Sequence, residues 1–476
     1  MIGVEGLAVG DGWVDPGTWA DVRFPYDGTV FGSSPVGTVE HAEQALAAAG
    51  AARAGAAALP THRRAAILRG AREQLEREAD AVLELILMET AKPIADCRTE
   101  LARTILALDL SAEEARRIHG ETVPVDLLPS GEGLLAFWQR RPAGVVVGIT
   151  GFNYPLMLAA HKAGPAVAAG CPVILKPSPR TPLSALYLAR VLRENGAPPA
   201  MVQALTGDAD VGERLVRDDR VAAVSFTGSA AVGHAIARAA AGKKVILELG
   251  SNAALVVAED ADLDAAARAC VRGGFYASGQ ACISVQRVIV VEAVRDAFLA
   301  RLAPLVAGLR AGDPREEGTS VGPLIDEGSA RRAHEWVEEA VGAGARVVQG
   351  GGRSGSLLEP TVLGDVPGGL RAWDEEIFAP VVAVRAAKTF DEALDMVNDS
   401  RYGLHASVFT ASLAYALKAA ERIEAGGVLI NEVPGFRADN MPYGGVKASG
   451  YGREGPRFVV EELTVTRMVI IRPEPL

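Results

Sequence analysis

The sequence predicts an α/β fold that consists of a doubly wound parallel-sheet domain, a second α/β domain and a small β element. Short runs rich in Val and Ile alternate with helical segments from Gly144 onward. Such runs are typical of strands that are buried on both faces of a parallel sheet. The chain has 476 residues, more than a single hydrophobic core usually accommodates, so two or three domains are expected.

Composition and charge argue against several classes of protein. The chain is 49% hydrophobic and 22% charged, which is typical of a soluble globular protein. Its 48 basic and 59 acidic residues give a net charge of −11 without a dense Lys/Arg run, so nucleic acid is not an expected partner. The apolar segments are far shorter than the roughly 20 residues of a membrane span. We see no signal peptide, and we therefore expect no membrane association and a cytoplasmic location.

The four cysteines form no disulfide or metal-binding pattern. They are Cys97, Cys171, Cys270 and Cys282, with no C-x-x-C pair and no Cys/His cluster at zinc spacing. We therefore expect neither a disulfide framework nor a metal site.

The first 120 residues divide into a β-rich start and a helical segment. Residues 7–37 are predicted to form short strands and turns. From Thr38 to about His119 the chain is rich in Ala, Leu, Glu and Arg, and Pro60 and Pro93 divide it into three or four helices. The amphipathic helix that carries Arg103 is expected to lie on the surface of a sheet.

Two β-rich segments differ in character from the rest of the chain. Residues 121–140 resemble an extended hairpin, and residues 462–471 form another apolar strand. Strands of this kind can pair with each other or with a second subunit, or they can be ordinary edge strands. The pattern alone leaves these alternatives open.

Two series of strands predict the two sheets. The first series lies at residues 145–149, 172–175, 201–205, 221–226 and 244–249. The second series lies at residues 255–257, 287–291, 345–349, 381–384, 406–410 and 427–431. Because ligands of doubly wound sheets bind at the carboxyl ends of the strands, residues that directly follow these strands are candidates for a site.

Glycine-rich segments after strands are candidates for phosphate binding. The one G-x-G-x-x-G, at Gly350, Gly352 and Gly355, is not followed by a helix, so we expect a surface turn there. Residues 206–212 and 227–233 are better candidates, because each segment follows a strand and starts a helix. Residues 226–229 could present N–H groups and a hydroxyl to a dinucleotide phosphate, or could simply cap the helix.

Three residues could supply reactive groups. Cys282 lies among small residues in the stretch 278–284 and could be a nucleophile or a buried structural cysteine. Glu248 ends the last strand of the first domain, where an acid is costly to bury unless it has a partner or a task. Asn153 follows the first parallel strand and could donate to an oxyanion or belong to a turn.

Together, these features resemble the NAD(P)-dependent aldehyde dehydrogenase superfamily. The resemblance extends from about residue 10 to the end of the chain, with every motif in the order found in the family. The residues that carry it are Asn153, Lys176-Pro177-Ser178, Phe226-Thr227-Gly228-Ser229, Glu248-Leu249-Gly250, Gly279-Gln280-Ala281-Cys282, Glu375-Glu376-Ile377-Phe378-Ala379-Pro380 and Pro442-Tyr443-Gly444-Gly445-Val446-Lys447.

The resemblance implies a covalent mechanism. Cys282 would be the nucleophile, Asn153 an oxyanion donor together with the Cys282 N–H, and Glu248 the general base. A thiohemiacetal would lose hydride to the nicotinamide, and the resulting thioester would be hydrolysed to the carboxylic acid. Members that pass the acyl group to coenzyme A typically lack an acid at the position of Glu248, so hydrolysis is favoured. The alternatives are a coenzyme A-acylating semialdehyde dehydrogenase and a non-catalytic structural or binding protein on the same scaffold.

The resemblance also implies a site for NAD or NADP. Lys176 would contact the adenosine ribose, and residues 228–229 the pyrophosphate. Pro179 stands where NAD-preferring members often have Glu, and Arg180 is adjacent, so the choice of cofactor stays open. Glu376 and Phe378 would contact the nicotinamide ribose and ring. The full set is Ile149, Thr150, Lys176, Ser178, Pro179, Arg180, Gly207, Phe226, Thr227, Gly228, Ser229, Leu249, Gly250, Glu376 and Phe378.

A third set of residues is expected around the aldehyde. Three of them are Arg103, His161 and Arg437. These residues could recognise the anionic tail of a small substrate, such as succinic semialdehyde, or they could form surface ion pairs. The stretch 435–442 looks most like the branch of the family with small, polar substrates. The full set expected to line or close the tunnel is Arg103, Tyr154, Met157, His161, Ile283, Phe436 and Arg437.

The resemblance divides the chain into three parts. Residues 1–120 and 141–248 would form the dinucleotide-binding domain, and residues 249–455 the catalytic domain. Residues 121–140 and 456–476 match the β element through which members of the family oligomerise, which favours subunit pairing. We therefore expect a homodimer or a homotetramer.

Overall fold

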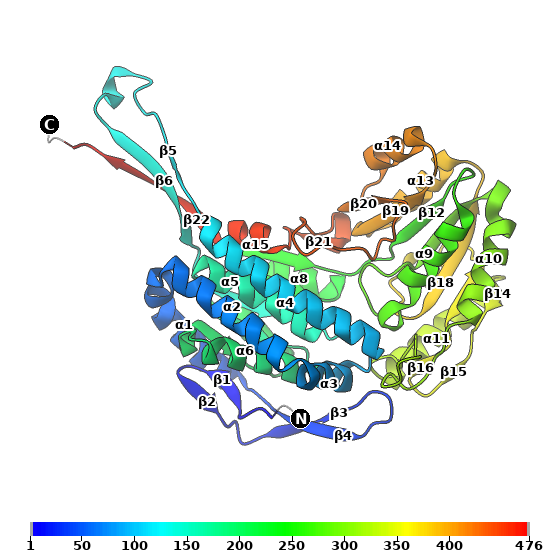
Figure 1. The fold of residues 1–476 in the computed structure, drawn as a ribbon, viewed down its shortest axis with the longest axis horizontal. Coiled ribbons are helices and arrows are strands. Elements are labelled where there is room, and N and C mark those ends of the chain that lie inside the picture. The colour runs from blue at the N-terminus through cyan, green and yellow to red at the C-terminus, as the bar shows by residue number, and fades with distance from the viewer. Residues whose placement is uncertain (1–2, 474–476) are drawn as a thin grey trace.

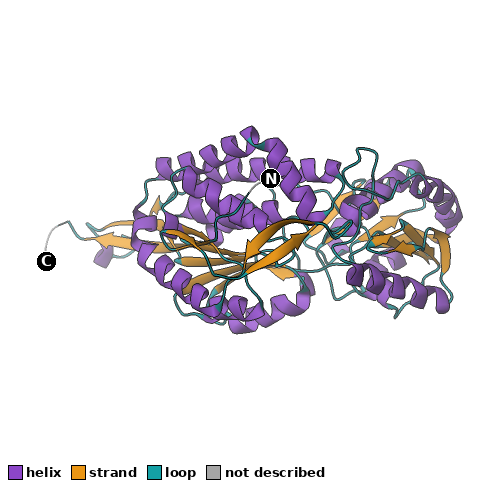
Figure 2. Ribbon diagram, turned by 90° about the horizontal axis from the view of Figure 1, so that it is seen from below, coloured by secondary structure: helices purple, strands orange, loops and turns teal. Residues whose placement is uncertain are grey.

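The fold consists of two helix-covered sheets and a projecting three-stranded arm (Figure 1). The computed structural model describes residues 3–473, so residues 1–2 of the expected first domain and residues 474–476 of the expected oligomerisation element lie outside the described residues. Seen after a 90° turn, the strands form a central layer with helices on both sides (Figure 2). The predicted α/β class with parallel sheets is confirmed.

The first sheet has eight strands in the order β2-β1-β9-β8-β7-β10-β11-β21. These strands are β1 (Leu7–Val9), β2 (Gly12–Val14), β7 (Val145–Ile149), β8 (Val173–Lys176), β9 (Val202–Ala204), β10 (Val221–Thr227), β11 (Lys244–Glu248) and β21 (Gly450–Tyr451). The strands from β7 to β11 run parallel and are largely buried, as expected for segments rich in Val and Ile. The helices between them are α5 (Pro155–Ala169), α6 (Leu183–Glu194), α7 (Ala209–Arg217) and α8 (Ala230–Ala239).

The register of this sheet brings the carboxyl ends of four strands together. Ile149 of β7 lies opposite Lys176 of β8 and Phe226 of β10. Thr227 of β10 lies opposite Glu248 of β11. Residues that follow these strands therefore share one edge of the sheet.

The N-terminal segment forms a hairpin and four helices, within the three or four helices predicted. The elements are β3 (Trp19–Arg23), β4 (Val30–Pro35), α1 (Val39–Ala58), α2 (Thr61–Arg77), α3 (Ala79–Thr90) and α4 (Ile94–Arg117). Helix α4, which carries Arg103, packs against α2 and α5 and not directly on the sheet as expected, because α5 covers the strands beneath it (Figure 1). Among the described residues, none of the helices combines the length and the apolarity needed to cross a membrane.

The second sheet has seven strands in the order β14-β17-β18-β13-β12-β19-β20. These are β12 (Ala254–Val257), β13 (Arg287–Val291), β14 (Arg346–Gln349), β17 (Thr361–Gly364), β18 (Val381–Ala387), β19 (His405–Phe409) and β20 (Gly427–Ile430). Its helices are α9 (Leu263–Phe275), α10 (Arg295–Ala307), α11 (Glu327–Gly342), α12 (Arg371–Asp374), α13 (Phe390–Asn398) and α14 (Leu413–Arg422). The strand β17 was not predicted. The G-x-G-x-x-G segment connects β14 to the hairpin of β15 (Arg353–Ser354) and β16 (Leu357–Leu358), with no helix after it.

The two predicted β-rich segments pair with each other and form the arm. Strand β6 (Leu135–Pro142) lies between β5 (Glu121–Thr122) and β22 (Thr464–Ile471), and both pairings are antiparallel. The arm projects away from both sheets (Figure 1).

The segment before β22 returns to the first sheet, which differs from the expected boundaries. Strand β21 pairs with β11, so that Gly450 lies opposite Glu248. Helix α15 (Pro456–Glu462) then packs against α4 and α5. Residues 450–462 therefore belong structurally with the first domain, because they cover the edge of β11 and the outer surface of α5.

Candidate active site

A cavity of about 460 Å³ lies where the carboxyl edge of the first sheet faces the second domain. Fifteen of the residues assigned from the sequence line it: Arg103, Asn153, Tyr154, Met157, Thr227, Gly228, Ser229, Glu248, Leu249, Gly250, Cys282, Ile283, Glu376, Phe378 and Arg437. Three more line a second cavity of about 300 Å³: Ile149, Lys176 and Phe226. The remaining residues line neither cavity: Thr150, His161, Ser178, Pro179, Arg180, Gly207 and Phe436.

The loop before Cys282 has three consecutive residues in the left-handed region. The φ angles are 47° at Ala277, 57° at Ser278 and 70° at Gly279. The first two have side chains, and such a conformation costs about 1–3 kcal/mol each unless the surroundings impose it. A side chain at position 279 would collide with the carbonyl of Ala379. Backbone strain of this kind is concentrated at functional sites.

Hydrogen bonds from other segments hold this loop. The Ala277 N–H donates to Oδ2 of Asp96 on α4 at 2.8 Å. The Ser278 hydroxyl donates to the carbonyl of Gly322 at 2.9 Å. The loop is therefore fixed from both the first and the second domain.

Cys282 is the cysteine that reaches the cavity. Its Sγ lies 3.1 Å from the hydroxyl oxygen of Tyr443. Burial raises the pKa of Cys282 to about 11, and the hydrogen bond with Tyr443 opposes that rise. The other three cysteines, Cys97, Cys171 and Cys270, are fully buried. Of the four, only Cys282 is therefore placed to meet a ligand.

Asn153 links the turn after β7 to the Cys282 loop. Its amide Nδ2 donates to the carbonyl of Gln280 at 2.8 Å. The amide has a second N–H, which stays available to a ligand in the cavity. Asn153 therefore contacts Gln280, the residue two positions before Cys282. Its amide lies near the nucleophile candidate, as is required of an oxyanion donor.

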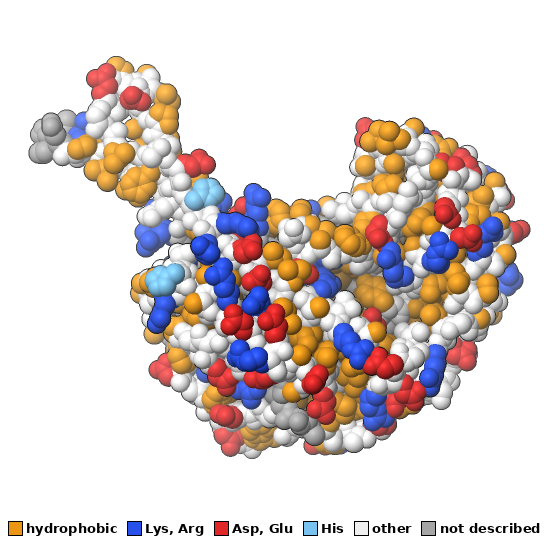
Figure 3. Space-filling view, viewed as in Figure 1, with side chains coloured by type: hydrophobic (Ala, Val, Ile, Leu, Met, Phe, Trp, Pro, Cys, Tyr) orange, Lys and Arg blue, Asp and Glu red, His pale blue; other side chains and the backbone are white. Residues whose placement is uncertain are grey.

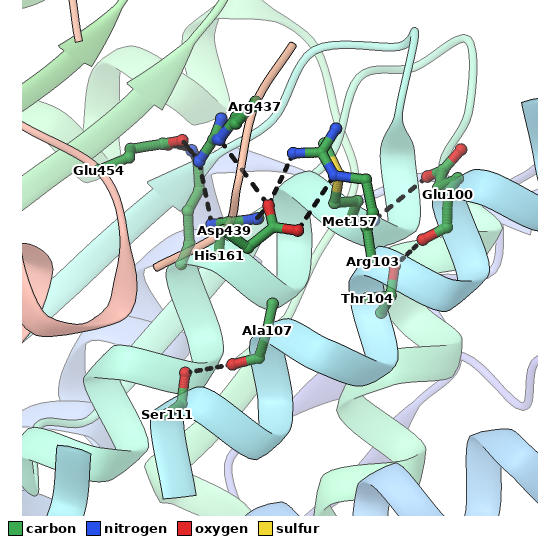
Figure 4. Close-up of polar contacts among 11 residues, drawn as sticks. Glu100, Arg103, Thr104, Ala107, Ser111, Met157, His161, Arg437, Asp439 and Glu454 are labelled. Atoms are coloured by element: carbon green, nitrogen blue, oxygen red, sulfur yellow. Dashed lines mark hydrogen bonds and ion pairs between the residues drawn. The ribbon is translucent and has the colours of Figure 1, made fainter. Parts of the chain in front are cut away.

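Glu100 on α4 fixes the start of α5 directly after Asn153. Its Oε1 accepts hydrogen bonds from the N–H groups of Leu156 at 3.0 Å and Met157 at 3.2 Å (Figure 4). The other carboxylate oxygen forms a buried ion pair with Lys92. Because Asp96 lies one helical turn before Glu100, a single helix holds both the Cys282 loop and the Asn153 turn.

Glu248 is buried at the end of β11 without a hydrogen-bond partner for either carboxylate oxygen in the described residues. Burial, and next the nearby carboxylate of Glu454, raise the pKa of Glu248 well above its ordinary value. A buried carboxyl without partners is costly, so it indicates a function. An elevated pKa also suits a general base.

Glu454, unlike Glu248, is fully paired. Its two oxygens lie 3.2 Å from Nζ of Lys162 and 3.2 Å from Nη2 of Arg437. Burial alone would raise the pKa of Glu454, but these two cations lower it to about 2. Lys162 also donates to the hydroxyl of Thr227 at 2.7 Å.

The start of α8 is shaped to hold a phosphate. Ser229 is the N-cap residue of α8, and its side chain makes no capping hydrogen bond. Both Gly228 and Ser229 line the cavity, and a side chain at position 228 would collide with the Phe226 ring. The first N–H groups of a helix favour an anion, so these residues fit the pyrophosphate of a dinucleotide.

Glu376 and Phe378 occupy the opposite wall. Burial raises the pKa of Glu376 to about 7, and its Oε1 accepts a hydrogen bond from the Ser251 N–H at 3.0 Å. A side chain at Gly250 would collide with this carboxylate. Phe378 has a φ of 53°, and its ring meets that of Phe152 edge-on at 5.7 Å between centroids. These features fit a ribose and a planar ring.

The second cavity is a mostly apolar slot between α7 and α8. Lys176 provides its amine, whose pKa is lowered by burial, and apolar side chains such as Ile149 and Phe226 form the walls. An apolar slot with one amine fits an adenosine group. Arg180, expected near the same ribose, instead forms an ion pair with Asp326 at the start of α11.

The substrate end of the main cavity differs in part from expectation. Arg103 makes a bidentate ion pair with Asp439, at 3.1 Å from Nε and 2.6 Å from Nη2 (Figure 4). His161 is buried behind the lining, 3.3 Å from Nη2 of Arg437 and 3.3 Å from Oδ1 of Asp439. Phe436 is 50% exposed. His161, which was expected to line the tunnel, and Phe436, which was expected to close it, are therefore not among the residues that line the cavity.

Polar residues of the site that were not assigned from the sequence include Lys162, Asp439, Tyr443 and Glu454. Asp439 lies within the stretch 435–442, and Tyr443 lies within the motif 442–447. Both segments contributed to the family resemblance, but neither residue was given a role. Lys162 lies one residue after His161 in a largely apolar helical segment. Because a lysine is rarely buried without a partner, its position there could have indicated a role in the site.

Comparison with known proteins shows the family of the chain. The sequence model described as "Aldehyde dehydrogenase family" matches residues 13–469, and the chain belongs to this family. It is an NAD(P)-dependent aldehyde dehydrogenase, as predicted.

Relatives with named substrates resemble the chain over most of its length. A 3-sulfolactaldehyde dehydrogenase of Priestia aryabhattai is 44% identical over 407 residues, which are 84% of this chain and 85% of the relative. The structure of aldehyde dehydrogenase 21 from Physcomitrella patens with the reaction product succinate has a TM-score of 0.95 at 37% identity and covers 99% of both chains. The NADP complex of glyceraldehyde-3-phosphate dehydrogenase from Methanocaldococcus jannaschii has a TM-score of 0.91 at 35% identity and covers 95% of this chain and 98% of that chain.

We expect Asp96→Ala to lower kcat about 10- to 100-fold, because Ala277 then lacks its charged acceptor and the strained loop loses its support. The KM for the aldehyde should change little, because Asp96 does not line the cavity. Steady-state kinetics at saturating cofactor measure both values.

Asp96→Asn keeps an acceptor oxygen and should retain most of the activity, so a loss equal to that of Asp96→Ala would contradict the hydrogen-bonding role. Arg98→Ala is the matched control on the same helix, because Arg98 forms an exposed ion pair with Glu317. Its kcat should equal that of the unaltered enzyme.

Proposed function

We propose that the enzyme oxidises a small aldehyde with an anionic tail to the carboxylic acid, with NAD or NADP as hydride acceptor. The observation that carries this proposal is the cavity in which Cys282, Asn153 and Glu248 meet, with Arg103 and Arg437 at its substrate end.

Cys282 acts as the nucleophile in this proposal. Its thiolate adds to the aldehyde carbon and forms a thiohemiacetal. The oxyanion accepts hydrogen bonds from the second amide N–H of Asn153 and from the backbone N–H of Cys282. A nicotinamide held at Glu376 and Phe378 would supply the hydride acceptor. The sulfur of Cys282 keeps the acyl group in place as a thioester once the aldehyde carbon has lost its hydride.

Glu248 acts as the general base that releases the product. Its buried carboxylate lacks hydrogen-bond partners and has an elevated pKa, so it can take a proton from a water molecule that attacks the thioester. The presence of this acid favours hydrolysis over transfer to coenzyme A. The tight ion pairs of Glu454 keep that second carboxylate ionised and leave Glu248 as the group that changes protonation state.

Positive charge at the substrate end supports an anionic tail. Three cationic side chains meet there: Lys162, Arg103 and Arg437. Two carboxylates remain ionised beside them, Asp439 and Glu454, whose pKa values lie below their ordinary values. Each cation has a carboxylate partner, but the three cations exceed these two carboxylates by one positive charge.

The side chain of Arg103 keeps one nitrogen available to a ligand. Burial, and next Arg437, lower the pKa of His161, which favours the uncharged form of this histidine. Nη1 of Arg103 makes no hydrogen bond in the described residues and points away from Asp439 (Figure 4). A carboxylate, sulfonate or phosphate on the substrate fits this nitrogen.

The names of the relatives agree with an anionic tail. A sulfonate is part of 3-sulfolactaldehyde, succinate has two carboxylates, and glyceraldehyde 3-phosphate carries a phosphate. All three substrates or products are short. The shared chemistry is therefore a small aldehyde with a negative charge at the far end.

A second copy of the chain covers the arm in this proposal. Apolar side chains gather on its surface (Figure 3), and several are strongly exposed: Leu127, Leu128, Leu135 and Ile470. Strand β22 forms the outer edge of the three-stranded sheet, so its outer backbone groups are free to pair. An apolar edge strand of this kind supports a homo-oligomer.

We expect Cys282→Ala to abolish reduction of the nucleotide, and Glu248→Gln to stop after a burst of about one nucleotide per active site, because the thioester is then not hydrolysed. Absorbance at 340 nm measures the burst, and intact mass spectrometry detects the acylated enzyme. Coenzyme A should not be required.

The exposed Glu335→Gln serves as the control for the loss of a carboxylate and should behave as the unaltered enzyme. Steady turnover of Glu248→Gln at the normal rate would refute its role as base.

We expect Arg103→Gln to lower kcat/KM for succinic semialdehyde about 10- to 100-fold, because one charge-assisted hydrogen bond is lost. The methyl ester of the same semialdehyde has no charge and should be affected less than about threefold. Arg98→Gln, on the same helix, is the control. An equal loss for the acid and its ester would show that Arg103 does not recognise the charge.

We expect Ile470→Asp to reduce the mass of the particle in solution, because a charge on the exposed face of β22 opposes its burial by a second copy. Light scattering after gel filtration at micromolar concentration measures this mass. Arg467→Ala on the same strand, which removes a charge instead of adding one, is the control. A monomeric unaltered protein would contradict the proposed oligomer.

A further inference from the structure

Tyr443 places its hydroxyl directly beside the sulfur of Cys282. The distance from Oη to Sγ is 3.1 Å, and this sulfur is the one hydrogen-bond partner of the hydroxyl within residues 3–473. The side chain is 2% exposed and lines the cavity. Tyr443 therefore contacts the atom that the proposed function makes the nucleophile.

The ring of Tyr443 is held in place by three neighbours. The Arg437 guanidinium lies over its face at 3.8 Å from the centroid, and the His405 ring meets it edge-on at 5.1 Å. Two backbone hydrogen bonds join Tyr443 to Glu454, at 3.1 and 2.6 Å. Because Glu454 also binds Arg437, the ring and the cation above it form one rigid unit. The hydroxyl is preorganised against Sγ.

The acidities of the Cys282 thiol and the Tyr443 phenol determine which of the two groups donates this hydrogen bond. A thiolate has no proton to donate, so the phenol must be the donor when Cys282 is ionised. Burial raises the pKa of Tyr443 well above its ordinary value, so the phenol keeps its proton at working pH. The cation over the ring polarises the phenol and strengthens it as a donor.

We propose that Tyr443 is a catalytic residue whose hydroxyl donates a hydrogen bond to the Cys282 thiolate and increases the ionised fraction of the nucleophile. This inference rests on the role of Cys282 in the proposed function. The thiol proton first leaves to solvent, and the sulfur electron pair then forms a bond to the carbonyl carbon. The π pair of the carbonyl moves to its oxygen, and the Tyr443 proton stays on Oη throughout.

The substitution Tyr443→Phe tests this role, because it removes only the hydroxyl and keeps the packing of the ring. The rate of alkylation by iodoacetamide, followed after brief jumps to pH values between 7 and 12, measures the thiolate without any aldehyde or nucleotide. This range includes the pKa of about 11 to which burial raises the Cys282 thiol. A missing hydrogen bond to a charged group should raise the apparent pKa of the thiol by about one unit. At pH 8 a pKa higher by one unit lowers the thiolate fraction about 10-fold. Because the more basic thiolate is also more nucleophilic, the rate of alkylation should fall only about 3- to 4-fold.

Two further variants make the result specific. Cys282→Ser should abolish labelling, which mass spectrometry of the peptides would locate. Tyr187→Phe removes another buried hydroxyl, bound to Glu78 at 2.9 Å and remote from the cavity, and should leave the alkylation profile unchanged. In the oxidation of aldehyde, the pH profile of kcat/KM for Tyr443→Phe should move to higher pH with little change in KM.

An alkylation profile of Tyr443→Phe that coincides with that of the unaltered enzyme would overturn this inference. A rate lowered equally at every pH, with an unchanged apparent pKa, would overturn it as well, because the hydroxyl would then act only on packing. If the unaltered enzyme oxidises no aldehyde, the proposed function fails, yet the alkylation profile still reports on Tyr443. The two failures are therefore distinguishable.

Discussion

The buried charge of Glu454 is the interaction on which the active site depends. It forms ion pairs with both Lys162 from α5 and Arg437 from the stretch before β21, and these two buried cations without it would cost several kcal/mol. Arg437 in turn covers the ring of Tyr443. After burial, the same carboxylate is the next cause of the raised pKa of Glu248. One residue thus joins the parallel sheet, the C-terminal segment and the base candidate into a single electrostatic unit.

Much of the fold and of the reactive set could be predicted because both leave local signals in the sequence. Buried parallel strands require long runs of Val and Ile, and these runs coincide with nearly all the central strands. The chemistry of a doubly wound sheet lies just after its strands, so Asn153 after β7 and Glu248 at the end of β11 were accessible from position alone. Cys282 was harder, because a small-residue loop has no periodic pattern, and only the family motif distinguished it.

The features that were missed arise from contacts between distant segments. Arg103 and Asp439 are separated by 336 residues, and no local pattern shows that one neutralises the other. His161 has helical spacing from Met157, but α5 is buried on every side, so the spacing does not tell which face meets the cavity. Strand β17 has only four residues, and its place depends on its neighbours. The ion pair of Arg180 with Asp326 is likewise a contact between two domains.

The pairing of β21 with β11 also has a consequence for the order of events in synthesis. Ribosomes release the N-terminal part first, and domains generally fold as they emerge. The first sheet then carries β11 as an open edge, with Glu248 at its end, until residues 450–451 have been made. Glu248, the proposed base, thus receives its last neighbouring strand only when translation is almost complete. A nascent chain that stalls before this point has most of its first sheet and an unprotected edge strand, which is free to pair with another chain.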